Sequence, residues 1–213
     1  MNSNSSTRSK ILPLRVRLRE ETNKAILQAA EQVFGSQGLG GARMEDIAAR
    51  AGVAVGTLYN HFQDRDALLS ELIVSRRHEL ARRLDEELRR GESADFARQL
   101  EGFVAALLSH FEEHRPFLSI LLESEHSRTA PVGARGARPN AALVEVYKRV
   151  QQLLERGIAA RALRHDDADL HSVFLMGLLR SVLARELYAP TQVPIAERAP
   201  QIAAFFLRGA ERR

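Results

Sequence analysis

The sequence has no cysteine and no tryptophan, and only 6% of its 213 residues are aromatic. Without cysteine the chain can form neither a disulfide bond nor a thiolate metal site. It also lacks any run of about 18 consecutive apolar residues, so we expect no membrane-spanning helix and no membrane partner. The N-terminus has no apolar segment of the length found in secretory signal peptides. We therefore expect a cytoplasmic protein.

The N-terminal segment has an excess of basic over acidic residues. The formal net charge is +4, and 45% of the residues are hydrophobic and 27% charged, a balance typical of a globular protein. Residues 1–19, however, contain five Lys or Arg residues and no acidic residue. A basic arm ahead of a small domain is typical of proteins that bind nucleic acids. We expect residues 1–16 to form a basic, disordered arm.

Apolar residues recur with the period of an α-helix along almost the whole chain after this arm. Between residues 26 and 34 they fall at Ile26, Ala29, Ala30, Val33 and Phe34, which form one face of a helix. No stretch alternates apolar and polar residues for long enough to predict a strand. We therefore predict an all-α fold with about nine helices. Their expected ranges are about 17–37, ending at Gly38; 44–51; 55–62; 65–90, capped by Asp64; a helix after a Ser93 cap; 116–124; 140–161; a helix that begins at Asp166 or Asp167 and ends before Pro190; and 195–207.

Residues 44–62, MEDIAARAGVAVGTLYNHF, have the pattern of a helix-turn-helix. The second helix crosses the first closely at a small residue, which Ala48 supplies. Gly52 follows four residues later, where the tight turn favours a left-handed conformation. Leu58, six residues further on, would hold the second helix to the core together with Val55 and Phe62. The alternative is an ordinary helical hairpin with a polar face toward solvent.

The same packing decides which side chains of the second helix face outward. Thr57, Asn60 and His61 follow one another at i, i+3 and i+4, and Tyr59 lies at the edge of this face. Hydrogen-bonding side chains of this length suit base edges and phosphates in a DNA major groove. Gly56 has no side chain, so the helix N-terminus could approach the DNA backbone closely. The pattern predicts a protein that binds double-stranded DNA.

A longer pattern surrounds this motif between residues 25 and 72. Its features are Ala29–Ala30, Phe34 and Gly38, then Asp46–Ile47–Ala48, Ala51–Gly52–Val53, Gly56–Thr57–Leu58–Tyr59, His61–Phe62 and the turn from Asp64 to Leu68. With these features the segment resembles the N-terminal region of the TetR (tetracycline-repressor) family. The resemblance covers about a quarter of the chain, and the remainder is similar only in length and in its helical plan. It implies a helix-turn-helix DNA-binding domain at 17–65 and an effector-binding and dimerisation domain at 66–213.

The resemblance implies roles for the matching residues. Thr57 and Tyr59 would contact phosphates, and Gly56 and His61 would approach bases or the adjoining backbone. Arg65, where the family usually has lysine, would hold a phosphate from the start of the next helix. Arginine suits this role because its planar guanidinium can bind a phosphate through two hydrogen bonds.

Two positions depart from the family pattern. Arg43 stands where the family often has threonine, and Val55 stands where it often has a basic or polar residue. Both should alter the DNA sequence that is recognised. The expected DNA-binding residues are therefore Arg43, Gly56, Thr57, Tyr59, Asn60, His61 and Arg65.

The C-terminal helices are numerous enough to enclose a cavity, and we expect an apolar or amphipathic small-molecule effector of unknown identity there. His110 falls on the apolar stripe of its helix, where it could line this pocket or be a satisfied core histidine. Tyr147, Arg180 and Arg185 lie beside apolar stripes, where a solvated or interface position is the simpler interpretation and a place in the pocket is the alternative. The expected pocket residues are Phe103, Leu107, His110, Tyr147, Phe174 and Leu178.

His110 and His114 have the four-residue spacing of paired metal ligands on a helix. The glutamate that a zinc protease needs directly after the first histidine is absent, and a third ligand would have to come from elsewhere, such as Glu125 or His126. Polar residues at a helix end explain the pair more simply, so we predict no metal and no cofactor. No pattern of catalytic residues stands out either, and we predict no enzyme.

An inverted-repeat operator requires two copies of the reader, so we expect a symmetric homodimer. The resemblance implies that the last two long helices form the seam, where Gly177 and Ser181 would allow a close crossing and Phe205 and Phe206 would add buried area. The alternative is that this stripe packs within its own chain. In the helix that is expected to end before Pro190, the stripe expected to face inward is Leu170, Phe174, Gly177, Leu178, Ser181 and Val182.

The expected function is a repressor that an effector releases from its operator. The helix at 65–90 is the only covalent link between the DNA-binding part and the rest, so the effector would act by tilting it. The alternative function is a DNA-binding or architectural protein that has no effector.

Overall fold

The computed structural model describes residues 13–127, 141–163 and 168–210, and in these ranges it confirms the all-α fold. The expected loop at 127–139 lies outside them except for Ser127, which ends a helix. The helices are α1 (Leu14–Gly41), α2 (Met44–Ala51), α3 (Val55–His61), α4 (Arg65–Arg90), α5 (Phe96–Glu113), α6 (Arg115–Ser127), α7 (Ala141–Ala159), α8 (Ala168–Tyr188), the 3₁₀ helix η1 (Ile195–Arg198) and α9 (Ala199–Ala210).

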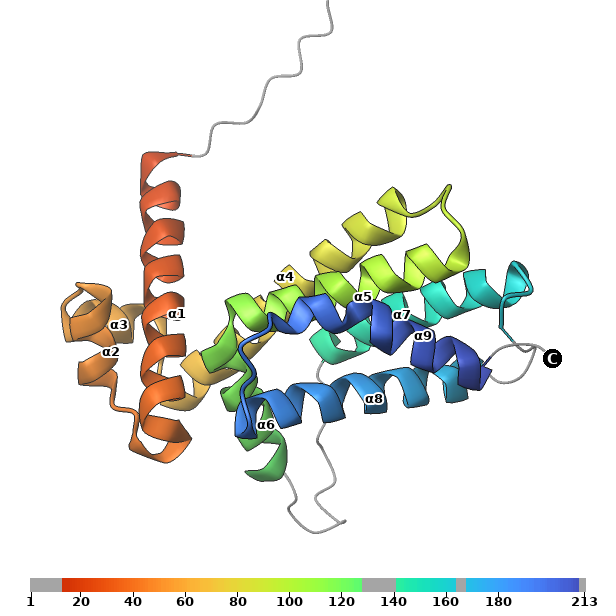
Figure 1. The fold of residues 1–213 in the computed structure, drawn as a ribbon. Coiled ribbons are helices and arrows are strands. Elements are labelled where there is room, and N and C mark those ends of the chain that lie inside the picture. The colour runs from red at the N-terminus through yellow and green to blue at the C-terminus, as the bar shows by residue number, and fades with distance from the viewer. Residues whose placement is uncertain (1–12, 128–140, 164–167, 211–213) are drawn as a thin grey trace, which may run out of the picture.

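The helices form two groups (Figure 1). Helices α1, α2 and α3, which we call the head, lie at the N-terminal end of α4. Helix α4 runs from the head into the body, which we define as α4 to α9. Among the described helices, none combines the length and the apolar character needed to cross a lipid bilayer.

The ends of the helices follow from local chemistry. Gly38 breaks the helical geometry of α1 with a φ of 74°, as its predicted role as a stop requires. Asp64 caps α4 as predicted, because its side chain accepts a hydrogen bond from the Ala67 N–H at 2.7 Å. The predicted Ser93 cap of α5 is wrong: Asp95 accepts from the Arg98 N–H at 2.9 Å instead. A cap must directly precede the first helical turn, and Asp95 alone holds that position.

Two hydrophobic cores support these groups. The head core contains Ile26, Ile47 and Leu58, and α4 contributes Leu68 to it. One residue of α6, Ile120, also belongs to the head core and is only 1% exposed. The body core is built by α4, α5, α7, α8 and α9 with parts of α6. Helix α6 therefore contributes to both cores.

Further contacts between α1 and α6 reinforce this connection. A Cβ atom added at Gly35 would overlap the Pro116 side chain and lie 2.9 Å from the Pro116 Cα atom. The Leu39 N–H donates to the two carboxylate oxygens of Glu123 at 3.2 and 3.3 Å. Helix α4 is the covalent link between head and body, but α6 is a second, non-covalent one that the sequence analysis did not foresee.

The predicted inward stripe of α8 is wrong for four of its six residues, since only Leu178 and Val182 pack against the body core. Phe174 is 57% exposed, and Leu170, Gly177 and Ser181 are exposed as well. The opposite side of α8 faces the core, because α7 and α9 pack on it. Both sides of this helix are apolar, so the spacing alone allowed either one to be buried. The buried residues are His171, Ser172, Leu175, Leu179, Leu183 and Glu186.

Candidate DNA interface and effector cavity

The turn between α2 and α3 has the geometry of a helix-turn-helix. Gly52 adopts the left-handed conformation with φ 69° and ψ 30°, which confirms the reason for a glycine at this position. The Val53 N–H donates to the Ala48 carbonyl at 3.0 Å, so the turn closes onto α2. Ala48 and Leu58 are fully buried, as their positions in the motif predict.

The outward face of α3 carries the predicted DNA-binding side chains. Tyr59 is 47% exposed, Asn60 is exposed, and Thr57 and His61 are half-buried. A Cβ atom added at Gly56 would have no neighbour within 4 Å, so the backbone there is open to a close approach. Val55, which was expected to point inward, is 37% exposed. It is the first residue of a seven-residue helix whose one fully buried residue is Leu58.

The two predicted DNA-binding arginines differ in their hydrogen bonds to the head. Arg43 is exposed at the N-cap of α2, where its side chain makes no capping hydrogen bond. Arg65 Nη1 donates to the Leu39 carbonyl at 2.9 Å, and its Nη2 atom lies 3.5 Å from Asp66. Arg65 therefore ties the start of α4 to the end of α1. Its side chain is 40% exposed, which leaves guanidinium N–H groups for a phosphate.

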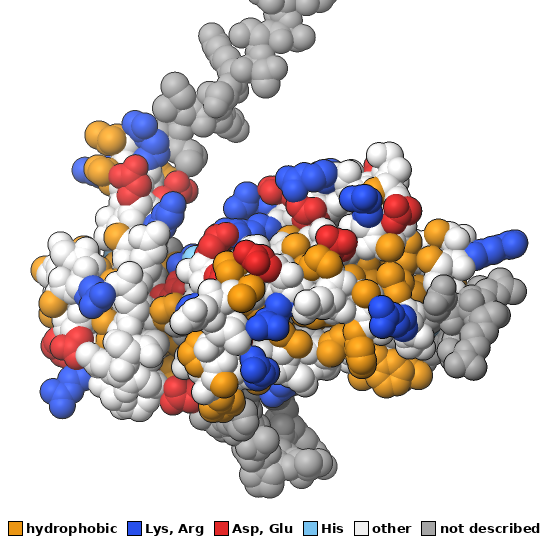
Figure 2. Space-filling view, viewed as in Figure 1, with side chains coloured by type: hydrophobic (Ala, Val, Ile, Leu, Met, Phe, Trp, Pro, Cys, Tyr) orange, Lys and Arg blue, Asp and Glu red, His pale blue; other side chains and the backbone are white. Residues whose placement is uncertain are grey.

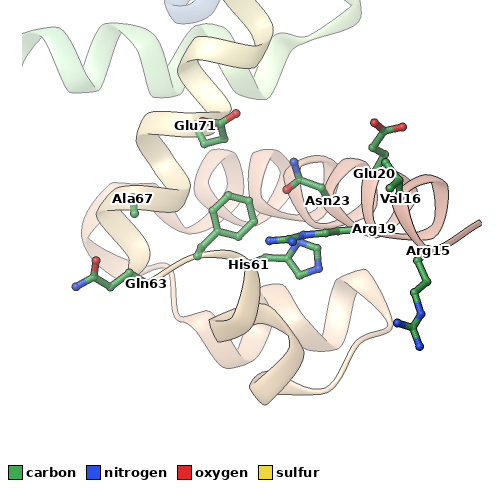
Figure 3. Close-up of a pocket in the computed structure, with 10 residues that line it drawn as sticks. Arg15, Val16, Arg19, Glu20, Asn23, His61, Gln63, Ala67 and Glu71 are labelled. Carbon is green, nitrogen blue, oxygen red and sulfur yellow. The ribbon is translucent and has the colours of Figure 1, made fainter. Parts of the chain in front are cut away.

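A groove of about 720 Å³ opens between the N-terminal half of α1 and the junction of α3 with α4 (Figure 3). Arg15 and Arg19 line it from α1, and the Arg19 guanidinium extends toward the His61 ring. Glu20 and Glu71 also line the groove. The sequence analysis did not select Arg15 and Arg19, although both belong to the basic, acid-free stretch at 1–19 that would have pointed to them.

A second hollow, which we call the body cavity, lies between α4, α5, α6, α7 and α8 and has a volume of about 330 Å³. Of the six predicted pocket residues, Leu107 and Tyr147 line it. Phe103 is buried in the body core, Leu178 packs against that core, and Phe174 lies on the outer face of α8. The spacing of apolar residues in the sequence assigned these residues to helices of the body. It did not show which faces of those helices line the cavity.

The body cavity has apolar walls with cationic groups among them. Leu118, Leu121 and Leu122 of α6 contribute to the apolar wall. Arg77 of α4, which is only 7% exposed, and Arg180 of α8 also line the cavity. Tyr147 therefore has a place in the cavity wall. Arg180 borders the cavity and is also exposed, so the solvated position that the sequence analysis favoured agrees with the structure.

Comparison with known proteins identifies the family. Residues 26–72 match the model of the bacterial regulatory proteins of the tetR family. The uncharacterized HTH-type transcriptional regulator TtgW of Pseudomonas putida is 33% identical to this chain over 105 residues, which are 48% of this chain and 74% of TtgW. The chain belongs to the TetR family. It is a helix-turn-helix, DNA-binding transcriptional regulator.

Two further regulators are similar to this chain beyond the head. The HTH-type transcriptional regulator AcrR of Shigella flexneri is 26% identical over 195 residues, which are 88% of each protein. The transcriptional regulator FadR of Bacillus subtilis, solved in complex with stearoyl-CoA, superposes with a TM-score of 0.74. That alignment covers 88% of this chain and 99% of FadR, at 17% identity, so it establishes a shared fold.

The body of this TetR-family chain exposes an apolar surface. Figure 2 shows hydrophobic side chains over the region of α8 and α9. Phe174 is 57% exposed and Phe205 is 69% exposed, whereas Phe206 is only 6% exposed and packs within its own chain. Gly177 and Ser181 are exposed, and a Cβ atom at Gly177 would meet nothing within 4 Å. Three of the four predicted seam residues therefore lie on the outer surface.

A charged cluster lies where α1, α4 and α5 meet, and His110 borders it. The His114 Nδ1 atom lies 3.2 Å from Glu31 Oε1, and Arg76 Nε donates to Glu31 Oε2 at 2.7 Å. Burial raises the pKa of Glu31, but the hydrogen bond with His114 and the charge of Arg76 outweigh it, so this pKa lies below its usual value. Burial, together with the neighbouring His114, lowers the pKa of His110 to about 4. His110 faces this cluster and does not line the body cavity.

Proposed function

We propose that this TetR-family regulator is a repressor that binds an inverted-repeat operator as a homodimer and leaves it when an amphipathic effector enters the body cavity. The observation that carries the proposal is the position of α6. Its residues Leu118, Leu121 and Leu122 line the body cavity, and Ile120 lies in the head core. A molecule that displaces the cavity-lining side of α6 must therefore also displace the side that packs in the head core.

The DNA side of the proposal rests on the outward face of α3. Tyr59 and Asn60 are exposed there, and Gly56 leaves room for a close backbone approach. Arg15 and Arg19 add positive charge in the adjacent groove, where a phosphate backbone would fit. In a dimer on an inverted repeat, the two α3 helices would be about 34–36 Å apart, or further by whole turns of the duplex.

The homodimer would form through the exposed apolar face of α8 and α9. Phe174 and Phe205 supply the large apolar side chains of this face, and isolated proteins rarely leave such side chains clustered in water. Gly177 and Ser181 would allow the backbones of two copies to approach closely. Phe206 is packed within its own chain and would contribute through the core that supports this face.

The chemistry of the body cavity favours an amphipathic effector with a negative group. Its apolar wall would hold a hydrocarbon portion, while Arg77 and Arg180 would attract a carboxylate or phosphate. FadR of Bacillus subtilis, which shares this fold, was solved with stearoyl-CoA. A volume of about 330 Å³ is small for a complete molecule of that size, so we propose a shorter acyl compound or an inserted acyl chain.

The effector would act by favouring one position of α6 and α4 over another. A ligand shifts such an equilibrium only through a difference in its affinity for the two conformations. Since the half-site spacing of the duplex is constant, a small change in the separation of the two heads would remove one of them from the DNA. The coupling must be reciprocal, so operator DNA must weaken effector binding by the same factor.

The deciding experiment measures effector affinity with and without operator DNA. Fatty acids and acyl-CoA esters of graded length would be screened by thermal shift, because a ligand of the folded state raises its stability. The operator would be selected from random duplexes. We expect a ligand whose affinity falls when the operator is present, and Arg180→Gln should weaken its binding. The matched control is Arg185→Gln on the same helix, which lies outside the cavity wall.

The same experiment separates the alternative function. If a ligand binds with equal affinity in the presence and absence of the operator, the release mechanism is wrong. If the chain binds its operator but no acyl compound shifts its thermal midpoint, the result favours a DNA-binding protein without such an effector.

A further inference from the structure

Glu79 of α4 and His110 and His114 of α5 bring one ligand atom each to within 4.8 Å of one another at the junction of head and body. His110 is fully buried, and neither of its ring nitrogens has a hydrogen-bond partner within the described parts of the chain. A buried polar atom without a partner is costly, so an unpaired imidazole in this position calls for a specific explanation. We propose that Glu79, His110 and His114 bind one divalent transition-metal ion such as Zn²⁺.

The orientation of His114 supports this assignment. An ionised carboxylate can only accept hydrogen bonds, so His114 Nδ1 must donate to Glu31 Oε1, 3.2 Å away. In the neutral ring, which is the form that binds a metal, this leaves the lone pair on Nε2, which lies 3.6 Å from Glu79 Oε1. In that form the imidazole and the carboxylate would both present lone pairs to a bound cation. A carboxylate that orients a histidine through its other nitrogen is a common feature of metal sites.

Glu79 can serve as a ligand while keeping its ion pairs. Its Oε2 atom lies 3.1 Å from Arg76 Nη1, and its Oε1 atom lies 3.2 Å from Arg83 Nη2. Each carboxylate oxygen has two lone pairs, so Oε1 can accept from Arg83 and still bind a cation. Arg83 is also paired with Glu113 at 2.9 Å. In the described cluster, three carboxylates outnumber two guanidinium groups; these belong to Glu31, Glu79 and Glu113 and to Arg76 and Arg83. The excess of negative charge favours the binding of a cation.

The donor set selects the class of metal. Two imidazoles and one carboxylate suit zinc and its neighbours in the first transition row, whereas Mg²⁺ and Ca²⁺ prefer oxygen ligands only. Metal–nitrogen distances in such sites are about 2.0–2.1 Å, so the three side chains would have to close in by on the order of 1 Å. The third ligand is Glu79, not the Glu125 or His126 that the sequence suggested, whose side chains lie outside the described residues.

The test uses the full chain without added histidines, stripped of metal with a chelator and titrated with Co²⁺, whose visible absorption reports coordination by nitrogen and oxygen. We expect one Co²⁺ per chain, displaced by Zn²⁺ and not by Mg²⁺. Glu79→Gln and His114→Gln should weaken Co²⁺ binding by about tenfold or more, and Glu31→Gln by about tenfold, since it only orients His114. His78→Gln is the matched control, because His78 is an exposed histidine adjacent to Glu79 in the sequence.

The proposal is overturned if the wild-type chain gives no Co²⁺ spectrum, or if His114→Gln binds Co²⁺ as tightly as the wild type. An equal loss in His78→Gln would likewise place the ion elsewhere. A second measurement does not depend on the folding of any variant. Zn²⁺ should shift the ring ¹⁵N resonances of His110 and His114 in the wild-type chain and leave those of His78 unchanged; the opposite pattern overturns the site.

Discussion

Gly35 of α1 lies directly against Pro116 at the start of α6, so closely that a Cβ atom at Gly35 would lie 2.9 Å from the Pro116 Cα atom. This contact joins the head to the helix that lines the body cavity. Neither partner can yield easily, because one is backbone and the other is a rigid ring. The pair therefore sets how closely the head can approach the body.

Replacing Gly35 with alanine should force α1 and α6 apart. We expect a loss of about 1–3 kcal/mol in the free energy of unfolding, the usual cost of overpacking, measured by urea denaturation. Gly40→Ala is the control, since a Cβ atom there meets nothing within 4 Å. Equal stability of the two variants would mean that this contact does not limit the approach of α1 to α6.

Phosphate contacts by the head should be visible in the salt dependence of DNA binding. Arg19→Ala and Arg65→Ala should each weaken binding to all sequences and lower the slope of log affinity against log salt by about one phosphate contact. Tyr59→Ala should weaken binding through a lost hydrogen bond and leave the slope nearly unchanged. Fluorescence anisotropy over a range of salt concentrations would measure both quantities.

The control for these arginines is Arg98→Ala, at an exposed site on α5 in the body. Arg65→Ala also removes the hydrogen bond to the Leu39 carbonyl, so its thermal midpoint must be compared with that of the wild type. An unchanged salt slope in Arg65→Ala would limit Arg65 to its structural bond with α1.

The exposed face of α8 and α9 should hold two copies together. Phe174→Glu and Phe205→Glu should shift the chain toward monomer in sedimentation velocity, because each would place an unpaired charge in an apolar interface. Gly177→Leu should act in the same direction by blocking the close crossing. Leu18→Glu is the control, as Leu18 is a similarly exposed apolar residue on α1. A stable dimer in all three seam variants would place the interface on another surface.

Glu186 should make the stability of the body depend on pH. Its carboxylate accepts from the Thr191 N–H at 3.0 Å and the Thr191 hydroxyl at 3.1 Å, and Arg115 Nη2 donates to it at 3.3 Å. Burial raises the pKa of Glu186, but the bonds from Thr191 and the charge of Arg115 outweigh it, so this pKa lies below the usual 4.5.

Because the folded state lowers this pKa, the stabilisation is complete above the unfolded value near 4.5 and is lost as the pH falls through the folded value. Glu186→Gln should therefore be less stable than the wild type at pH 7, and the difference should shrink as the pH drops below about 4.5. Urea denaturation at several pH values would measure it. A difference that does not change with pH would assign the effect to packing.

The helix-turn-helix was predictable because its determinants are local. Gly52 ends α2 in the left-handed conformation, and Asp64 caps α4 through a residue three positions away. Leu58 is buried because the motif directs its side chain into the head core. Each of these features depends on neighbours within a few residues, so residue type and spacing were sufficient. The same locality explains the success of most helix boundaries.

Features that depend on which helix packs against which face required the folded chain. Helix α8 is apolar on both sides, and only the packing of α7 and α9 turned Leu175 and Leu179 inward and left Phe174 in solvent. His110 carries the spacing of a pocket residue, yet the folded chain places it beside Glu79, which is 31 positions away in the sequence. Periodicity specifies the angle of a side chain around its own helix. The neighbour that this side chain meets depends on contacts between segments that are distant in the sequence. The free energy of burial in these contacts is shared among many residues, so no short stretch of sequence determines it.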